Sequence, residues 1–456
     1  MSRSRTLSLD SRDTTMPASV VSSTVVEAVA AETGWPTIDY WPAENAMFWG
    51  RRFGAVYPTW LGRRYVYLLG PEANEFVFAN DGLFRVREAF RGLIPVDGPT
   101  ALIVTDGPDH ARRRALVRPS LHHRQVAGYV ETMARTADEA LDRVVPGTTI
   151  DGYQLFRAAI RRSTLRTLFG ERLAEHADTL GEQLQPLLSL ADLMPDVVEW
   201  HARLNTPRYR RAMAARAAVI ARIDTEIARI RNLDHDAESQ VLAMLVHGRD
   251  GTGSGLTDDE IHDQAIMLIA AGYETTSAAM GWLLYAIGPR PELQDRLRAE
   301  LAEVTGGRTP TSADLGRLPL LSATVTETLR LYPPAAVSAR YVAEEFRFGG
   351  RRVRPGTTLL YSPYATHRDP KVYAEPRVFR PERWLGDERR PAAEFLPFGG
   401  GIHRCIGSSM ATAELTVMLT RLIARGRFSL PAQRIHAQGI SAMRPREGVQ
   451  IRLATG

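Results

Sequence analysis

The chain has almost no cysteine: Cys405 is the one thiol among 456 residues. A single thiol excludes an intramolecular disulfide framework and a structural zinc site held by several cysteines. It is typical of a protein that works in a reducing compartment, and we therefore expect a cytoplasmic location. The surrounding stretch, FLPFGGGIHRCIGSS (395–409), raises the question of why this cysteine stands in a glycine-rich loop.

Lysine is also nearly missing. Lys371 is the one lysine, so arginine supplies 56 of the 57 basic residues, and the net charge is +5 with a pI of about 9.4. The arginines are scattered and mixed with 52 acidic residues, unlike the clustered pattern of a nucleic-acid-binding face. We expect no nucleic-acid partner, whereas a basic surface for an acidic protein stays open.

Long uncharged apolar runs are absent too. A membrane-spanning helix needs about 18 or more such residues, and the nearest candidate, 265–287, carries Glu274 in its middle. We predict a long buried helix there and no membrane span. Residues 1–25 are polar and lack the apolar core of a secretory signal. Residues 1–35 are therefore predicted to be a disordered leader, and 36–456 a single domain.

Most of the chain has the pattern of helices. From about residue 106 to 300, helix-forming residues carry apolar side chains at helical spacing. Shorter β-like segments lie at 63–70 and 338–363, and the second has the pattern of two strands joined by a turn at Gly349-Gly350. An apolar stripe over 411–422 predicts a helix after Cys405. The fold class that we expect is mainly α with small β-sheets.

Cys405 on its own has an ordinary explanation, since a lone cysteine is most often a small buried apolar residue. Its neighbours favour a different role. Gly399, Gly400 and Gly401 allow unusual backbone angles and a close approach to another group. A helix that starts just after Cys405 directs N–H groups at the sulfur and stabilises a thiolate. The segment therefore has the features of an anion-stabilising loop that contacts a flat ligand or a metal.

The spacing of Phe398, Gly401, His403, Cys405 and Gly407 resembles the haem-binding loop of the cytochrome P-450 family. The common form of this motif has a basic residue where His403 stands, and histidine is an accepted alternative. The resemblance implies that Cys405 is the thiolate ligand of the iron of haem b, where a thiolate supplies electron density that favours O–O cleavage. It also implies the family's fold, with haem between a long central helix and the helix after the cysteine loop.

A second motif, ETLRLYPP, places Glu327 and Arg330 three residues apart on one helix face. An exposed pair of this kind is common and contributes little. The resemblance gives it a structural role instead, in which Arg383 of the FRPERW segment joins the pair and locks the region behind the haem.

A third motif, AAGYETTSA (270–278), lies inside the predicted long helix. Glu274 could be an exposed glutamate on a locally distorted helix, since threonine hydroxyls bond to the preceding turn and bend it. The resemblance implies an oxygen-activation site instead. Glu274 would relay protons, Thr275 would hold water or hydroperoxide beside the iron, and Gly272 would leave space for dioxygen.

Basic groups are needed to compensate the two haem propionates. His110 and Arg114 lie four residues apart in TDGPDHARRRALVRP, a pattern that would also suit a solvated basic helix face. The resemblance singles out these two residues as propionate partners, together with Arg340 and His403.

The resemblance implies a soluble bacterial-type monooxygenase that inserts one atom of O2 into a C–H or C=C bond, so that 36–456 is a catalytic domain. Electrons would come from NAD(P)H through a separate ferredoxin reductase and ferredoxin, with the surface around Arg404 as the docking site. A peroxygenase that uses hydrogen peroxide and a non-catalytic haem-binding sensor stay as alternatives. Without the resemblance, the chain would be a helical protein with one reactive thiol.

The substrate pocket is predicted from the same resemblance to be largely apolar, which suits a terpenoid, steroid, fatty acid or polyketide. Ordinary core packing would give a similar composition. The residues predicted to line it are Phe90, Leu93, Ile94, Leu102, Leu193, Met194, Trp200, Met267, Ala271 and Val337.

Overall fold

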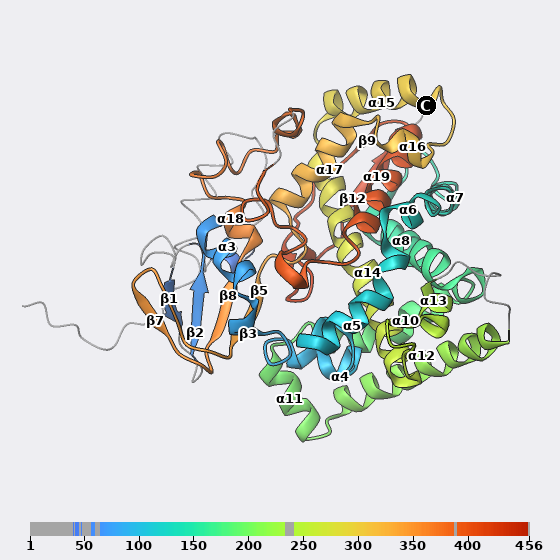
Figure 1. The fold of residues 1–456 in the computed structure, drawn as a ribbon. Coiled ribbons are helices and arrows are strands. Elements are labelled where there is room, and N and C mark those ends of the chain that lie inside the picture. The colour runs from blue at the N-terminus through green and yellow to red at the C-terminus, as the bar shows by residue number, and fades with distance from the viewer. Residues whose placement is uncertain are drawn as a thin grey trace, which may run out of the picture. The chain divides into compact units, whose positions relative to one another are not determined.

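The computed structural model describes residues 40, 42–44, 47, 56–59, 64–232, 241–386 and 390–454. The predicted leader, 1–35, lies outside the described residues, as does the start of the predicted domain. Tyr40–Gly456 forms one compact unit in which helices predominate (Figure 1).

The helices are distributed along the whole of this unit. Their bounds are α3 Pro71–Ala79, α4 Ile94–Asp97, α5 Gly107–Val117, α6 His123–Ala127, α7 Val130–Leu141, α8 Gly152–Phe169, α9 Glu171–Ala174, α10 Ala177–Ala191, α11 Pro195–Arg203, α12 Pro207–Arg231, α13 Val241–His247, α14 Asp258–Ile287, α15 Pro291–Thr305, α16 Ser312–Leu315, α17 Pro319–Leu331, α18 Pro363–Thr366 and α19 Ser408–Ala424. Short 3-10 helices are η1 Asp81–Leu83, η2 Arg91–Leu93, η3 Leu102–Val104, η4 Arg118–Leu121, η5 Pro381–Trp384 and η6 Gly401–His403.

The strands are short and form small sheets. Their bounds are β1 Val56–Thr59, β2 Tyr65–Leu68, β3 Phe84–Arg85, β4 Thr149–Asp151, β5 Ser338–Val342, β6 Phe346–Phe348, β7 Arg351–Val353, β8 Thr358–Tyr361, β9 Phe428–Ser429, β10 Ala437–Gln438, β11 Arg444–Pro445 and β12 Gln450–Leu453. A five-stranded sheet has the order β1-β2-β8-β5-β3, with β2 and β8 parallel and the other pairs antiparallel. The order β4-β12-β9 makes a three-stranded sheet, and β6-β7 and β10-β11 are two-stranded. The predicted mainly helical protein with small sheets is confirmed.

The segment 338–363 is more divided than the predicted pair of strands. Its turn at Gly349-Gly350 is present, with φ of 55° and 74°, values that favour glycine. This turn joins only the short hairpin β6–β7, whereas β5 and β8 pair with each other in the five-stranded sheet, with Ser338 opposite Tyr361. The segment therefore holds four strands in two sheets.

The long helix α14 is the predicted buried helix, and the part of it outside its middle turn is buried on nearly all sides. It begins with a capping box in which Thr257 and Glu260 satisfy each other's backbone N–H groups. Helix α14 packs against α8, α17 and α19 (Figure 1). Among the described helices, none combines the length and apolar character that crossing a membrane requires.

Two hydrophobic clusters support this arrangement. The larger cluster includes side chains of α7, α8, α14, α17 and α19. The smaller one lies between the five-stranded sheet and α3 and contains Val77, Phe84, Leu359 and Leu396. Because Leu396 precedes the cysteine loop directly, the smaller core holds the start of that loop in place.

Candidate active site

The Cys405 loop follows Leu396 of the smaller hydrophobic cluster and ends where α19 begins at Ser408. Helix α19 is the helix that we predicted after Cys405. The Cys405 N–H donates to the Phe398 carbonyl at 2.9 Å, which closes the loop. Gly399 and Gly401 both have φ of 66°, where a side chain would be strained. A Cβ at Gly400 would lie 2.3 Å from the Phe78 ring. These glycines therefore let the loop pack against α3, a reason that the sequence did not indicate.

The Cys405 thiol lies deep in the protein, and burial raises its pKa. The N–H of Gly407 and the positive charges of Arg114 and Arg404 act in the opposite direction and favour the thiolate. Cys405 is nevertheless exposed. A residue that is enclosed by protein and still accessible must face an internal opening.

Helix α14 has the matching feature in its middle. Ala271 is exposed and Gly272, Glu274 and Thr275 are partly exposed, although the turns before and after this stretch are buried. Since α19 packs against α14, we interpret the two exposed surfaces as opposite walls of one chamber. Such a chamber fits a flat cofactor that is ligated by the cysteine on one face and covered by α14 on the other.

The four residues predicted to hold the propionates gather from three separate parts of the chain. The rings of His110 on α5 and His403 in the loop have centroids 4.2 Å apart. Arg114 donates to the Arg404 carbonyl at 2.7 Å, and Arg340 on β5 is buried with its guanidinium 5.4 Å from the Tyr361 ring centroid.

The electrostatics of this group fit an anionic ligand. Burial, followed by the charges of neighbouring groups including Arg340 and Arg114, lowers the pKa of His403 to about 3. Burial and the charge of Arg114 also lower the pKa of His110. Asp106 is the nearby acid, 3.7 Å from His403 Nε2, but it already accepts from the N–H groups of Val86 and Arg87. Excess positive potential therefore remains for carboxylates such as haem propionates.

The carboxylate of Glu274 has a partner that the sequence did not reveal. Arg157 on α8 forms an ion pair with it, and Arg157 Nε lies 3.1 Å from Glu274 Oε1. The general rule that a buried carboxylate is paired was the only signal, because Arg157 belongs to no motif. Glu274 is thus held toward α8.

Gly272 precedes and Thr275 follows Glu274, the residue predicted to relay protons. The Thr275 hydroxyl donates to the Ala271 carbonyl at 2.9 Å, as expected for a threonine that bends a helix. A Cβ at Gly272 would lie 3.1 Å from Cγ2 of Thr164 on α8. Gly272 therefore permits close packing of α14 on α8, and a role in leaving space for dioxygen stays a prediction.

Glu327, Arg330 and Arg383 meet in one buried network. Arg330 donates twice to the Glu327 carboxylate, both at 2.8 Å, and neither side chain has any exposed surface. Arg383 Nε and the Arg380 N–H donate to Oε1 at 3.0 and 2.9 Å, and Trp384 Nε1 donates to Oε2 at 2.7 Å. The carboxylate is fully used, so α17 is tied to η5.

His367 extends this network to the cysteine loop. Arg330 donates to the His367 carbonyl at 2.7 Å, and His367 Nδ1 lies 2.9 Å from the Arg330 carbonyl. His367 Nε2 accepts from the Leu396 N–H at 3.0 Å. Burial and the charge of Arg330 hold the pKa of His367 well below its ordinary value, so the ring is neutral, with its proton on Nδ1. His367 was missed because it belongs to no motif, and Trp384 was missed although it ends the FRPERW segment.

The predicted pocket residues separate into two groups. Phe90, Leu93 and Ile94 are partly buried against the main core, and Met267 lies one helical turn before Ala271 on α14. Leu102 is buried, and Leu193 and Val337 are partly buried. Met194, beside α11, and Trp200, in α11, are 44% and 54% exposed, and their place in the pocket stays a prediction. Helix α11 packs on η2 and α12.

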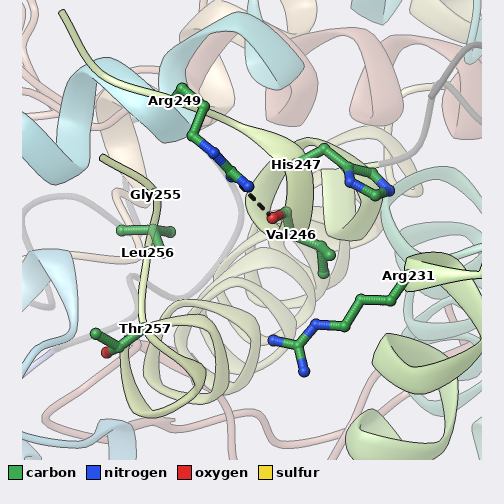
Figure 2. A pocket seen from close by; sticks show the side chains of 7 residues that line it. All are labelled: Arg231, Val246, His247, Arg249, Gly255, Leu256 and Thr257. Carbon is green, nitrogen blue, oxygen red and sulfur yellow. Dashed lines mark hydrogen bonds between the residues drawn. The ribbon is translucent and has the colours of Figure 1, made fainter. Parts of the chain in front are cut away.

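A pocket of about 500 Å³ lies elsewhere, between the end of α12, the end of α13 and the start of α14 (Figure 2). It contains none of the residues predicted for the site. Its basic groups are engaged, because Arg231 pairs with Asp258 and Arg249 donates to the carbonyls of Val246 and Gly248. We therefore assign the chemistry to the chamber at Cys405.

Comparisons with known proteins agree with this assignment. The family model for cytochrome P450 matches residues 42–451. The chain is 48% identical over 399 residues to putative cytochrome P450 139 of Mycobacterium tuberculosis, which covers 86% of this chain and 93% of that protein. It is 30% identical to pentalenene oxygenase of Streptomyces avermitilis, over 79% of this chain and 81% of that protein.

Two further similarities concern the activity and the fold. Cyclooctat-9-en-7-ol 5-monooxygenase of Streptomyces melanosporofaciens is 33% identical, over 78% of this chain and 76% of that protein. The structure of retinoic acid-bound cyanobacterial CYP120A1 matches with a TM-score of 0.81 at 24% identity, covering 89% of this chain and 92% of that one. This last match shows the fold. The chain therefore belongs to the cytochrome P450 family and is a haem-thiolate monooxygenase.

Proposed function

We propose that this enzyme inserts one oxygen atom of O2 into a hydrophobic small molecule of the terpenoid class, by hydroxylation or epoxidation. The observations that support the proposal are the exposed residue Cys405, just before α19, and the exposed turn of α14 at Glu274 and Thr275, on two helices that pack together. The names of two relatives, which give cyclooctat-9-en-7-ol and pentalenene as their substrates, support the substrate class. The apolar side chains of Leu93, Ile94 and Met267 are consistent with it.

The residues present fit haem b as the cofactor. Cys405 would ligate the iron, and His110, Arg114, Arg340 and His403 would neutralise the propionates. The bound haem supplies the iron on which dioxygen is reduced and its O–O bond is broken. The N–H of Gly407 and the charges of Arg114 and Arg404 partly offset the burial that raises the pKa of Cys405, so they favour the thiolate that the iron would bind.

Glu274 and Thr275 would supply protons to the chamber. Glu274 starts in an ion pair with Arg157, so delivery requires its carboxyl group to leave Arg157 and turn toward the chamber. The Thr275 hydroxyl donates to its own helix and can accept a hydrogen bond from water on the chamber side. A carboxyl group that alternates between an outer arginine and an inner hydroxyl transfers protons and leaves the chamber closed to bulk solvent.

Electrons would reach the site from a separate ferredoxin, reduced by an NAD(P)H-dependent reductase in the cytoplasm. Arg404 and Arg118 are exposed beside the cysteine loop, and both act on Arg114 through space. Ile402 of the same loop is also exposed. A basic surface that includes an apolar side chain of the cysteine loop suits an acidic ferredoxin.

Charge reversal tests this docking surface. Arg404→Glu and Arg118→Glu together should slow reduction by ferredoxin and weaken the dependence of the rate on salt. Arg347→Glu, on the exposed β6–β7 hairpin, is the matched control and should have no effect. Unchanged rates in the double variant would remove the proposal for this surface.

Product analysis tests the reaction itself. The purified enzyme, with a ferredoxin, its reductase, NADPH and O2, should add one labelled oxygen atom from ¹⁸O2 to members of a terpenoid panel. Turnover with hydrogen peroxide but none with reduced ferredoxin would identify a peroxygenase. Binding of haem without turnover by either route, across terpenoids, steroids and fatty acids, would indicate a non-catalytic haem protein.

A further inference from the structure

The segment that follows α4 is bound to the long helix α14 by two adjacent side chains. Gln264, which has no exposed surface, accepts from the Leu102 N–H at 3.0 Å and donates to the Thr100 carbonyl at 2.7 Å. Asp263 accepts from the backbone N–H and from the hydroxyl of Thr100 at 2.9 and 2.6 Å. Both residues therefore fix the backbone of this segment, and we call them the α14 clamp.

The contacts of Asp263 extend to α12 and to the start of the segment. Arg216 of α12 pairs with Asp263 and donates through Nε to the Val96 carbonyl at 3.2 Å. Gly98 has φ of 98°, which favours glycine, and a Cβ there would lie 1.8 Å from Oδ1 of Asp263. The backbone at Gly98 thus lies directly against the carboxylate. These contacts join residues 96–102 to both helices.

The clamped segment lies along the part of α14 that leads to its exposed turn. Ile94 and Leu102, before and at the end of the segment, are both residues predicted for the substrate pocket. The 3-10 helix η3 begins at Leu102 and packs on α14 and α5. Met267 and Ala271 follow Gln264 by three and seven residues, so the three lie on one face of α14. The clamp therefore precedes the exposed turn by about two helical turns on the same face.

We propose that Asp263 and Gln264 are positioning residues that hold residues 94–102 as one wall of the chamber and thereby select large apolar ligands, without touching the ligand themselves. This inference rests on the proposed chamber between Cys405 and α14. A wall made of short helical turns and loop keeps its side chains in place only where other groups fix its backbone. Gln264 bonds to backbone groups alone, so it sets the position of the wall.

A buried glutamine of this kind has an ordinary alternative role, which Gln294 on α15 illustrates. Gln294 also has no exposed surface, accepts from the Phe428 N–H at 3.0 Å and donates to the Phe428 carbonyl at 2.9 Å. It ties α15 to β9, and neither element carries a residue predicted for the pocket. A purely structural glutamine should affect stability alone. Gln264 and Gln294 therefore form a matched pair for an experiment.

The test compares Gln264→Met with Gln294→Met in the full-length protein with bound haem. Both changes keep the length of the side chain and leave two buried backbone groups without their partner, so urea unfolding should show destabilisation of similar size. The shift of the Soret band measures the affinities for imidazole and for 4-phenylimidazole. The ring nitrogen of each ligand binds the iron, but only the phenyl group needs a wall to pack against.

Gln264→Met should lower the affinity for 4-phenylimidazole by about tenfold, the factor for losing part of the burial of one aromatic ring. It should leave the affinity for imidazole unchanged, and Gln294→Met should change neither affinity. Thr100→Val removes one donor to Asp263 and keeps the shape of the side chain, so it should act in the same direction with a smaller effect. This milder variant decides the question if Gln264→Met does not retain haem.

An unchanged ratio of the two affinities in Gln264→Met and Thr100→Val would overturn the proposal and leave the α14 clamp a purely structural feature. An equal loss of 4-phenylimidazole affinity in Gln294→Met would overturn it as well, because the loss would then follow stability. A wild type whose Soret band neither ligand shifts would remove the chamber and this proposal with it. Because azole binding needs no turnover, these outcomes are separate from a failure to oxidise terpenoids.

Discussion

The buried Glu327 network gives the sharpest quantitative prediction. Glu327→Gln keeps the size of the side chain but removes the charge that compensates Arg330. Arg330 has no exposed surface, and its remaining partners are the carbonyls of His367, Pro376 and Val378. Removing one partner of a buried pair costs about 3–5 kcal/mol. This is a large share of the about 5–15 kcal/mol by which ordinary domains are stable.

The other hydrogen bonds of Glu327 also predict that Glu327→Gln destabilises the folded protein. A glutamine has one acceptor oxygen, whereas the carboxylate accepts five hydrogen bonds, from Arg330 twice and from Arg380, Arg383 and Trp384. At least two of these donors would be left beside an NH2 group. We therefore expect the upper part of the range of destabilisation.

Urea unfolding of the haem-bound protein, followed by circular dichroism, measures the effect. Glu382→Gln is the matched control, because Glu382 belongs to η5 as well but pairs with Arg296 at the surface, with exposures of 42% and 52%. An exposed pair contributes about 0–1 kcal/mol. A Glu327→Gln variant as stable as Glu382→Gln would refute the view that this network locks the region behind the cysteine loop.

The remaining predictions concern protons. Glu274→Gln should lower O2-dependent turnover about a hundredfold while leaving the haem spectrum and substrate-induced spin shift intact, and Glu303→Gln, at an exposed position, should not. Asp97 has a pKa of about 7, raised mainly by burial and also by Asp263, against the attraction of Arg216. Between about pH 4 and 7 the folded state holds this proton and the unfolded state does not, so stability falls as pH rises. Asp97→Asn should thus gain stability relative to wild type over that window, by at most about 4 kcal/mol.

Clear outcomes would contradict these two predictions. Normal O2-dependent turnover in Glu274→Gln would remove the glutamate from the proton route. For Asp97, urea unfolding at several pH values should give a variant and a wild type that converge toward pH 4, and parallel pH profiles would show that Asp97 titrates normally. Asp258→Asn is a control of opposite sign, since hydrogen bonding to Arg231 lowers the pKa of Asp258 and its loss should destabilise as pH rises.

Features encoded within one continuous segment were predictable from the sequence. The long helix α14, the helix after Cys405 and the turn at Gly349-Gly350 depend on local periodicity and turn chemistry, and all are present. The spacing around Cys405 likewise indicated the family that the comparisons show. Local patterns succeed here because neighbouring residues alone determine them.

Features that depend on partners far along the chain were not predictable. Arg157 meets Glu274 across 117 residues, and His367 meets Leu396 only because two loops converge behind α17. The reason for Gly400 lies in Phe78 on α3. In each case tertiary packing selects the partner, and the sequence gives only the residue type.

The absorption spectrum of the reduced protein under carbon monoxide tests the central claim most directly. A thiolate from Cys405 on haem iron predicts the red-shifted Soret band of this ligation, and Cys405→Ser should lose that band while the protein stays folded. Absence of the band in the wild type, or its persistence in Cys405→Ser, would contradict the assignment of Cys405 as the iron ligand.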